Sequence, residues 1–175
     1  MSIILKRAAV FGAIAGLSAC SQGQENIFRP NPGSKHFSIS GNWTTLGGVN
    51  TYQIILGGGW YLTDRLSAVA KFGLAKHSPE EREYFIGARY DLKRNGSSMP
   101  YLLAGIEFHD GARPQTVLIL DPNAGPKATF FEGGIGLDFF LGPNSSFFGE
   151  FVGFKTSSEQ SIGVDFTVGV RFFFK

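Results

Sequence analysis

The clearest structural signal in the chain is IGVDFTVGVRFFF, residues 162–174. Every second residue from Ile162 to Phe174 is apolar, whereas the residues between them are small or polar, with Phe173 as the exception. A period of two is typical of a β-strand with one apolar face, and this run is longer than the usual strand of about five or six residues. The pattern therefore predicts a long strand whose two faces meet different surroundings.

Seven further segments with this period precede it, separated mostly by turn-forming residues such as Gly142-Pro143-Asn144-Ser145. No helical pattern of useful length follows the first 35 residues. Long strands with short links predict an all-β fold, an eight-stranded up-and-down antiparallel barrel rather than a Greek-key sandwich. The expected strands cover 36–46, 50–62, 65–76, 82–92, 99–108, 128–141, 146–155 and 161–174.

Away from the segment ends, charged residues share one face of each strand. Where the interior of a segment carries two charges the pair lies on the same face, as Asp165 and Arg171 do. Glycines gather on the same faces, which suits the narrow interior of an eight-stranded barrel. We therefore expect a network of ion pairs and hydrogen bonds inside the barrel, made by Lys71, Arg89, Asp91, Glu107, Glu132, Asp138, Glu150, Asp165 and Arg171.

The opposite faces are aliphatic, with aromatic residues toward the strand ends. Two aromatic girdles around an apolar band, with polar residues inside, are typical of a transmembrane barrel. Such a barrel must close, because unpaired strand edges are costly in hydrocarbon. One expected girdle holds Phe37, Trp60, Tyr90, Phe139, Phe147 and Phe172, and the other holds Trp43, Tyr52, Tyr84 and Phe131.

The charges inside the barrel leave one functional alternative open. Six acidic and three basic groups inside predict water in the lumen or some protonated carboxyl groups. The alternative to a filled interior is a small cation-conducting path lined by the acidic groups.

A second alternative is a lipid-tethered carrier, since Gly41-Asn42-Trp43 is similar to the Gly-x-Trp of the lipocalin first strand. A lipocalin has its apolar face inside and charges outside, whereas the apolar face of residues 162–174 carries no charge. This difference favours the membrane barrel.

Residues 1–19 predict a signal peptide. Lys6 and Arg7 precede an apolar run over residues 8–17, which at roughly ten residues is too short to span a bilayer. Its end, Leu17-Ser18-Ala19-Cys20, resembles the lipobox of bacterial lipoproteins, which implies acylation of Cys20 and cleavage before it. Ordinary cleavage after Ala19, leaving a free thiol, is the alternative. Residues 20–35 then form a lipidated N-terminus and a polar linker, and residues 36–175 form the barrel.

Composition excludes several classes of protein. With 43% apolar and 17% charged residues the chain is unlike a disordered protein. Its single Cys excludes a disulfide framework and a Cys-based zinc site. The net charge of +2 gives no reason to expect a nucleic acid partner, and removal of Lys6 and Arg7 with the leader leaves 14 charges of each sign.

Several motifs resemble the superfamily of small eight-stranded outer-membrane barrels, of the OmpA-barrel, OmpX and opacity-protein kind, over residues 36–175. They are GGWYLTDRLS (58–67), PYLLAGI (100–106), GIGLD (134–138) and TVGVRFFF (167–174). The resemblance implies a monomer in the bacterial outer membrane, surrounded by lipid and lipopolysaccharide, with both termini in the periplasm. It also implies that the barrel-assembly machinery reads Phe174, and that outward loops lie near 47–49, 77–81, 109–127 and 156–160.

The resemblance extends to enzymes, since lipid A deacylases of this scaffold carry His-x-Ser-Asn on a late strand. The equivalent stretch here, residues 154–159, contains no His. We expect His36 to be a polar residue at the periplasmic rim, and His77 and His109 to be solvated near strand ends. No motif for a phosphate, metal or other cofactor is found. A non-enzymatic structural or envelope-interaction role is therefore expected, with a lipid A-modifying hydrolase as the alternative.

Overall fold

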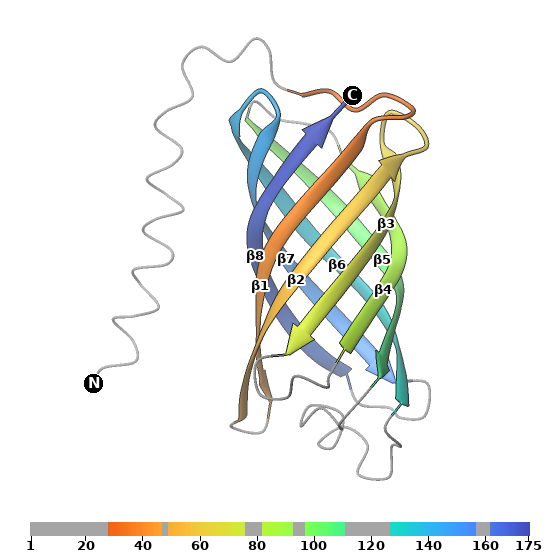
Figure 1. Cartoon of the computed structure of the whole chain (residues 1–175), viewed down its shortest axis with the longest axis vertical. Helices are drawn as coiled ribbons and strands as arrows, with labels where there is room; N and C mark the ends of the chain where they lie inside the picture. Colours follow the sequence, from red (N-terminus) through yellow and green to blue (C-terminus); the bar gives the residue numbers. More distant parts are fainter. Residues whose placement is uncertain (1–27, 47–48, 76–81, 93–96, 111–126, 157–161) are drawn as a thin grey trace, which may run out of the picture.

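The computed structural model describes residues 28–46, 49–75, 82–92, 97–110, 127–156 and 162–175. Each strand pairs antiparallel with the next, and β8 pairs with β1, so the sheet closes into a barrel (Figure 1). The predicted up-and-down barrel is confirmed, with strand ends within a few residues of those expected. The strands are β1 (Lys35–Leu46), β2 (Val49–Tyr61), β3 (Leu66–Ala75), β4 (Arg82–Asp91), β5 (Ser98–Asp110), β6 (Lys127–Gly142), β7 (Ser145–Thr156) and β8 (Ile162–Phe174).

The strands are long enough to cross a membrane. The shortest has 10 residues and the longest 16, whereas a tilted transmembrane strand needs about 9–11. The part of the chain that the structure describes contains no helix of the length and hydropathy that crossing would require.

The two ends of the barrel differ. We call the end that holds Lys35, Phe174 and the turns after β2 and β6 the turn end, and the opposite end the loop end (Figure 1). The turn after β2 has a local cause, because the Thr63 hydroxyl oxygen accepts hydrogen bonds from the backbone N–H groups of Arg65 and Leu66 at 3.2 and 2.9 Å. A Ser or Thr side chain commonly closes a turn in this way.

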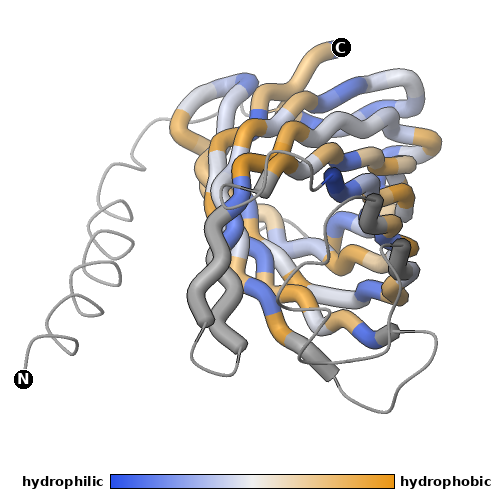
Figure 2. The backbone as a smooth tube through the Cα atoms, turned by 60° about the horizontal axis from the view of Figure 1, so that its bottom comes forward, coloured by the Kyte–Doolittle hydropathy of each residue, from blue (hydrophilic) through white to orange (hydrophobic). Residues whose placement is uncertain are grey.

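Apolar side chains cover the outside of the barrel. Figure 2 shows hydrophobic and hydrophilic residues alternating along the strands, and the outward residues include Ile54, Ile86, Ile106 and Val164, all exposed. The charged and hydroxyl side chains that are buried point the other way. An apolar outer face around a polar interior is the arrangement of a membrane barrel, and the opposite of the lipocalin-like alternative.

The interior is packed rather than open, and large apolar side chains lie inside it, including Phe173, the exception to the alternation in residues 162–174. Phe148, Val152 and Phe154 of β7 and Phe173 of β8 all lie buried inside the barrel. Phe173 belongs to an aromatic and apolar cluster at the turn end with Phe28, Tyr61, Met99 and Phe140, which we call the turn-end cluster. Eight strands enclose a space that side chains can fill, so large apolar residues are accommodated inside as well as outside.

Residues 28–34, expected as the end of a polar linker, pack against the barrel. This segment, which we call the strap, crosses the turn end before β1 begins (Figure 1). The Phe28 ring stacks on Phe173 with 4.6 Å between centroids, and the Phe28 N–H donates to the Pro143 carbonyl at 2.7 Å. The Gly33 N–H donates to the Tyr61 carbonyl at 2.8 Å. The strap therefore covers the interior at this end.

Candidate functional site

The turn-end half of the lumen holds six charged side chains joined in one line. The line runs Asp91–Arg89–Asp138–Arg171–Glu150–Lys71, with alternating signs and five ion pairs at 2.6, 2.6, 2.7, 3.1 and 2.5 Å in that order. We call it the ion-pair chain. Its members come from β3, β4, β6, β7 and β8, so it crosses the interior of the barrel.

The ion-pair chain is neutral and almost completely buried. Arg89 and Asp138 have exposed fractions of 1% and 0%. Burial of a charge is tolerated when it is paired and hydrogen-bonded, and here three cations face three carboxylates. A buried pair makes a small net contribution to stability when intact, but removal of one partner is strongly destabilising.

Hydroxyl groups add further hydrogen bonds to the ion-pair chain. The Tyr61 hydroxyl donates to Asp91 at 2.7 Å, the Tyr101 hydroxyl to Glu150 at 2.9 Å, and the Ser146 hydroxyl to Asp138 at 2.6 Å. Tyr101 lies at the centre of this arrangement, because the Arg89 guanidinium also stacks on its ring at 3.8 Å. Such short charge-assisted contacts are stronger than neutral ones, so the ion-pair chain is held in one arrangement.

The turn-end half of the lumen is consequently filled. The guanidinium of Arg171 stacks on Phe148 at 4.1 Å, and the turn-end cluster and the strap lie beyond the ion-pair chain. Gly136 shows how closely the groups fit, since a Cβ atom at this position would collide with the Tyr101 ring.

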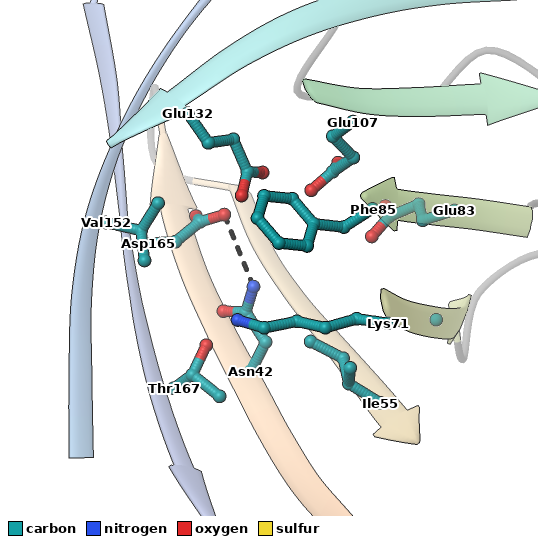
Figure 3. A pocket seen from close by; sticks show the side chains of 11 residues that line it. Asn42, Ile55, Lys71, Glu83, Phe85, Glu107, Glu132, Val152, Asp165 and Thr167 are labelled. Carbon is teal, nitrogen blue, oxygen red and sulfur yellow. Dashed lines mark hydrogen bonds between the residues drawn. The ribbon is translucent and has the colours of Figure 1, made fainter. Parts of the chain in front are cut away.

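The loop-end half of the lumen contains a small acidic pocket of about 30 Å³. Figure 3 shows the carboxyl groups of Glu107, Glu132 and Asp165 pointing toward the space around Phe85 and Lys71. A volume of this size admits about one or two water molecules. Among the described residues, no group of three or more His, Cys, Asp or Glu side chains is arranged to hold a metal ion.

Two contacts organise the pocket wall. The Asn42 side-chain amide donates to Asp165 at 3.3 Å, the dashed line in Figure 3. The Gln53 amide donates to Glu83, a residue that also lines the pocket. The Lys71 ammonium, which lies over the Phe85 ring at 5.2 Å, is also ion-paired to Glu150. Lys71 therefore links the acidic pocket to the ion-pair chain.

The structure places all nine residues of the expected lumen network inside the barrel, but divides them into two groups. One group forms the ion-pair chain, and the other contributes to the acidic pocket, with Lys71 in both. The members of the ion-pair chain are Lys71, Arg89, Asp91, Asp138, Glu150 and Arg171, and those at the pocket are Lys71, Glu107, Glu132 and Asp165.

Sequence reasoning missed Glu83, Tyr61 and Tyr101 as partners in the lumen. A signal for all three was present in the alternation. Glu83 has the same parity as Arg89 in β4, and Tyr101 has the same parity as Glu107 in β5, so each faces inward with its neighbour. Tyr61 likewise alternates with the exposed Trp60 at the end of β2.

Most residues of the expected girdles lie on the outer face. At the turn end Phe37, Trp60, Tyr90 and Phe172 are exposed, and Phe139 and Phe147 are half-buried and line an outer groove. At the loop end Tyr84 and Phe131 are exposed. Trp43 and Tyr52 pair across β1 and β2, but their side chains lie outside the described residues.

His36, expected as a polar residue at the rim, lies near the start of β1 at the turn end, but its side chain does not face the rim surface. His36 is buried inside the turn end, 5.9 Å from the Tyr61 ring and 6.0 Å from the Phe173 ring between centroids. His77 and Cys20 lie outside the described residues, as does the side chain of His109. Phe174, the expected assembly signal, ends β8 with its side chain exposed.

The sequence matches no protein-family model and no curated protein. Three solved barrels are similar in structure. The N-terminal β-barrel domain of Pseudomonas aeruginosa OprF has a TM-score of 0.61 at 17% identity, over 83% of this chain and 100% of that one. A de novo designed transmembrane β-barrel has 0.58 at 16%, over 83% and 99%. The Yersinia pestis outer membrane protein Ail has 0.53 at 15%, over 81% and 99%.

These similarities show that the fold is that of a small outer-membrane barrel. The outer face supports the same placement independently, because a closed sheet with its apolar residues outside is stable in hydrocarbon. The eight antiparallel strands also agree with the even strand number of single-chain bacterial outer-membrane barrels. The chain therefore has the fold of a small transmembrane β-barrel, with an outer face suited to a membrane.

Proposed function

We propose that this protein is a non-enzymatic barrel with a structural or envelope-interaction role, which presents its loop end at the cell surface. The observation that carries the proposal is the filled turn-end half of the lumen, where the ion-pair chain, the turn-end cluster and the strap lie in succession. Such an interior stabilises a scaffold and opposes passage of solutes. The acidic pocket is then a hydrated recess rather than part of a channel.

The proposal includes lipid attachment at Cys20, supported by the lipobox resemblance of residues 17–20. In that modification the Cys sulfur bonds to the glyceryl carbon of a phospholipid, the phosphate headgroup leaves, and the thiol proton is released. Water then cleaves the peptide bond before Cys20. The partners we propose are outer-membrane lipid, lipopolysaccharide and the assembly machinery that reads Phe174, and we propose a monomer that binds no nucleic acid.

A closed lumen predicts that the purified protein conducts no steady ionic current. In a planar bilayer in KCl solution, we expect the refolded barrel to give the same current as a bilayer with mock-treated detergent. Folding is checked on the same sample by gel mobility before and after boiling. Reproducible, voltage-independent current steps would instead support the acid-lined cation path, because those steps require continuous water along the lumen.

A non-enzymatic role predicts that the protein leaves lipid A unchanged. Mass spectrometry should find the same lipid A in cells that produce the wild-type protein, cells that lack it, and cells that produce His36→Ala, His77→Ala or His109→Ala. His36 is buried away from the outer face, which supports this expectation. A lipid A species that needs the wild-type protein and disappears with one of these replacements would establish the hydrolase instead.

A further inference from the structure

An apolar groove of about 520 Å³ lies on the outer face of the barrel over β5, β6, β7 and β8. The volume falls within the range of about 300–1,000 Å³ of sites that hold small ligands. Outward residues along it include Leu102, Leu137, Phe147, Phe151 and Phe166. The groove is therefore suited to an apolar ligand within the membrane.

The groove exists because Gly149 stands between Phe147 and Phe151 on the outward side of β7. A Cβ atom at Gly149 would meet only the Phe166 ring within 4 Å, at an ordinary contact distance of 3.8 Å. The floor of the groove is thus open, and a larger side chain could occupy it without moving the backbone. Gly133, an outward glycine of β6, has no atom within 4 Å of such a Cβ and does not line the groove.

The groove begins beside the point where the strap starts. Phe139 and Phe147, which pair across β6 and β7, line its turn-end part. The Pro143 carbonyl, in the turn between these two residues, accepts the hydrogen bond from Phe28. The four residue steps from Pro143 through the turn to Phe147 span at most roughly 13 Å. The described chain therefore starts close to one end of the groove and on the same face of the membrane.

We infer that the groove holds an acyl chain carried by Cys20, an inference that rests on the proposed lipid attachment. Eight residue steps separate Cys20 from Phe28, and an extended chain of that length spans at most roughly 29 Å. This reach exceeds the distance from Pro143 to the turn-end part of the groove. The strap fixes one end of the linker beside the groove, which puts the groove within reach of the lipid.

An acyl chain suits the groove better than a second copy of the protein. A two-fold contact between copies would place groove against groove, and two concave surfaces leave an unfilled space between them. A flexible hydrocarbon chain adapts to the space between Phe147, Phe151 and Phe166 and gains dispersion contacts along its length. Tethering adds to this binding, because attachment to the same molecule raises the local concentration of the chain.

The test uses the full-length protein in its membrane, made by cells supplied with a fatty acid that carries a diazirine near its end. After illumination, mass spectrometry searches for a product in which the acyl chain joins the Cys20 peptide to peptides of β6 or β7. We expect this product in the wild type. Its yield should fall about tenfold or more in Gly149→Phe, because the new ring fills the groove, and remain unchanged in the matched control Gly133→Phe.

The other outcomes distinguish failure of the proposed lipid attachment at Cys20 from failure of the groove assignment. A mature N-terminal peptide without acyl groups would overturn both the lipid attachment and the groove assignment. An acylated Cys20 peptide with cross-links spread evenly over all strands would overturn the groove assignment alone. Cross-links at the groove only to free phospholipid, equal in the wild type and in Cys20→Ser, would assign the groove to surrounding lipid and would also overturn it.

Discussion

Replacement of Asp138 with Ala is expected to lower the free energy of unfolding of the barrel by about 3–5 kcal/mol, the usual effect of leaving a buried charge without its partner. Asp138 accepts hydrogen bonds from Arg89 at 2.6 Å and from Arg171 at 2.8 and 2.7 Å. Both arginines are almost fully buried. Loss of the carboxylate would leave two neighbouring guanidinium groups with an excess of positive charge inside the lumen.

Urea unfolding in detergent or lipid, followed by tryptophan fluorescence, measures this effect. Asp64→Ala is the matched control, because Asp64 also faces an arginine, Arg65, at 3.9 Å, but both side chains are more than half exposed. Exposed pairs contribute about 0–1 kcal/mol, so the control should unfold almost as the wild type does. If Asp138→Ala does not fold at all, Ser146→Ala removes a single hydrogen bond to Asp138, with an expected loss of about 1 kcal/mol.

Equal stability of Asp138→Ala and Asp64→Ala would contradict the interpretation of the ion-pair chain. It would mean that water reaches Arg89 and Arg171 and solvates them. In that case the lumen would be open at the turn end, and the proposed closed scaffold would lose its main support. The stability measurement and the conductance measurement therefore test the same structural statement by independent means.

The second large effect is expected on the outer face, where Ile86→Arg should lower stability by about 2–4 kcal/mol, the cost of Arg near the middle of the bilayer. Ile86 lies in the middle of β4 with 65% of its surface exposed. Its cross-strand neighbours are Ala70 and Ile106. In water, an exposed isoleucine would tolerate this change almost without effect.

Leu62→Arg is the control for this prediction. Leu62 has a similar exposed fraction, 56%, but follows β2 in the turn that leads to β3. A charge near the membrane interface costs only about 0–1 kcal/mol. Both variants are compared by urea unfolding in lipid vesicles and by gel mobility with and without boiling. If the two replacements had the same small effect, the outer face would be in contact with water and the membrane placement would be wrong.

Alternation along each strand was readable from the sequence because it is a local property. Arg89 and Asp91 share a face whatever surrounds them, and so do Asp165 and Arg171, since side chains two residues apart in a strand always point to the same side. The closed barrel, its number of strands and the outward direction of Ile86 and Val164 follow from this period and from the turns. The barrel fold was therefore predictable from the sequence.

The partners across the lumen were not accessible in this way. Asp138 binds Arg89 and Arg171, and Glu150 binds Lys71, across 49, 33 and 79 positions of sequence. These contacts depend on the register and tilt of strands that are not all neighbours. The position of Phe28 was not predictable either. Its polar neighbours in sequence indicated a linker, whereas its ring packs on Phe173 at the turn end of the barrel.

By itself, then, the sequence determined the strands, the face each side chain takes and the medium each face prefers, because these follow from periodicity and polarity within short segments. Only the tertiary structure decided that the charges divide into a neutral ion-pair chain and an acidic pocket, that the strap covers the turn end, and that Gly149 opens a groove outside. These features arise where distant strands meet, and their geometry is set by closure of the whole sheet.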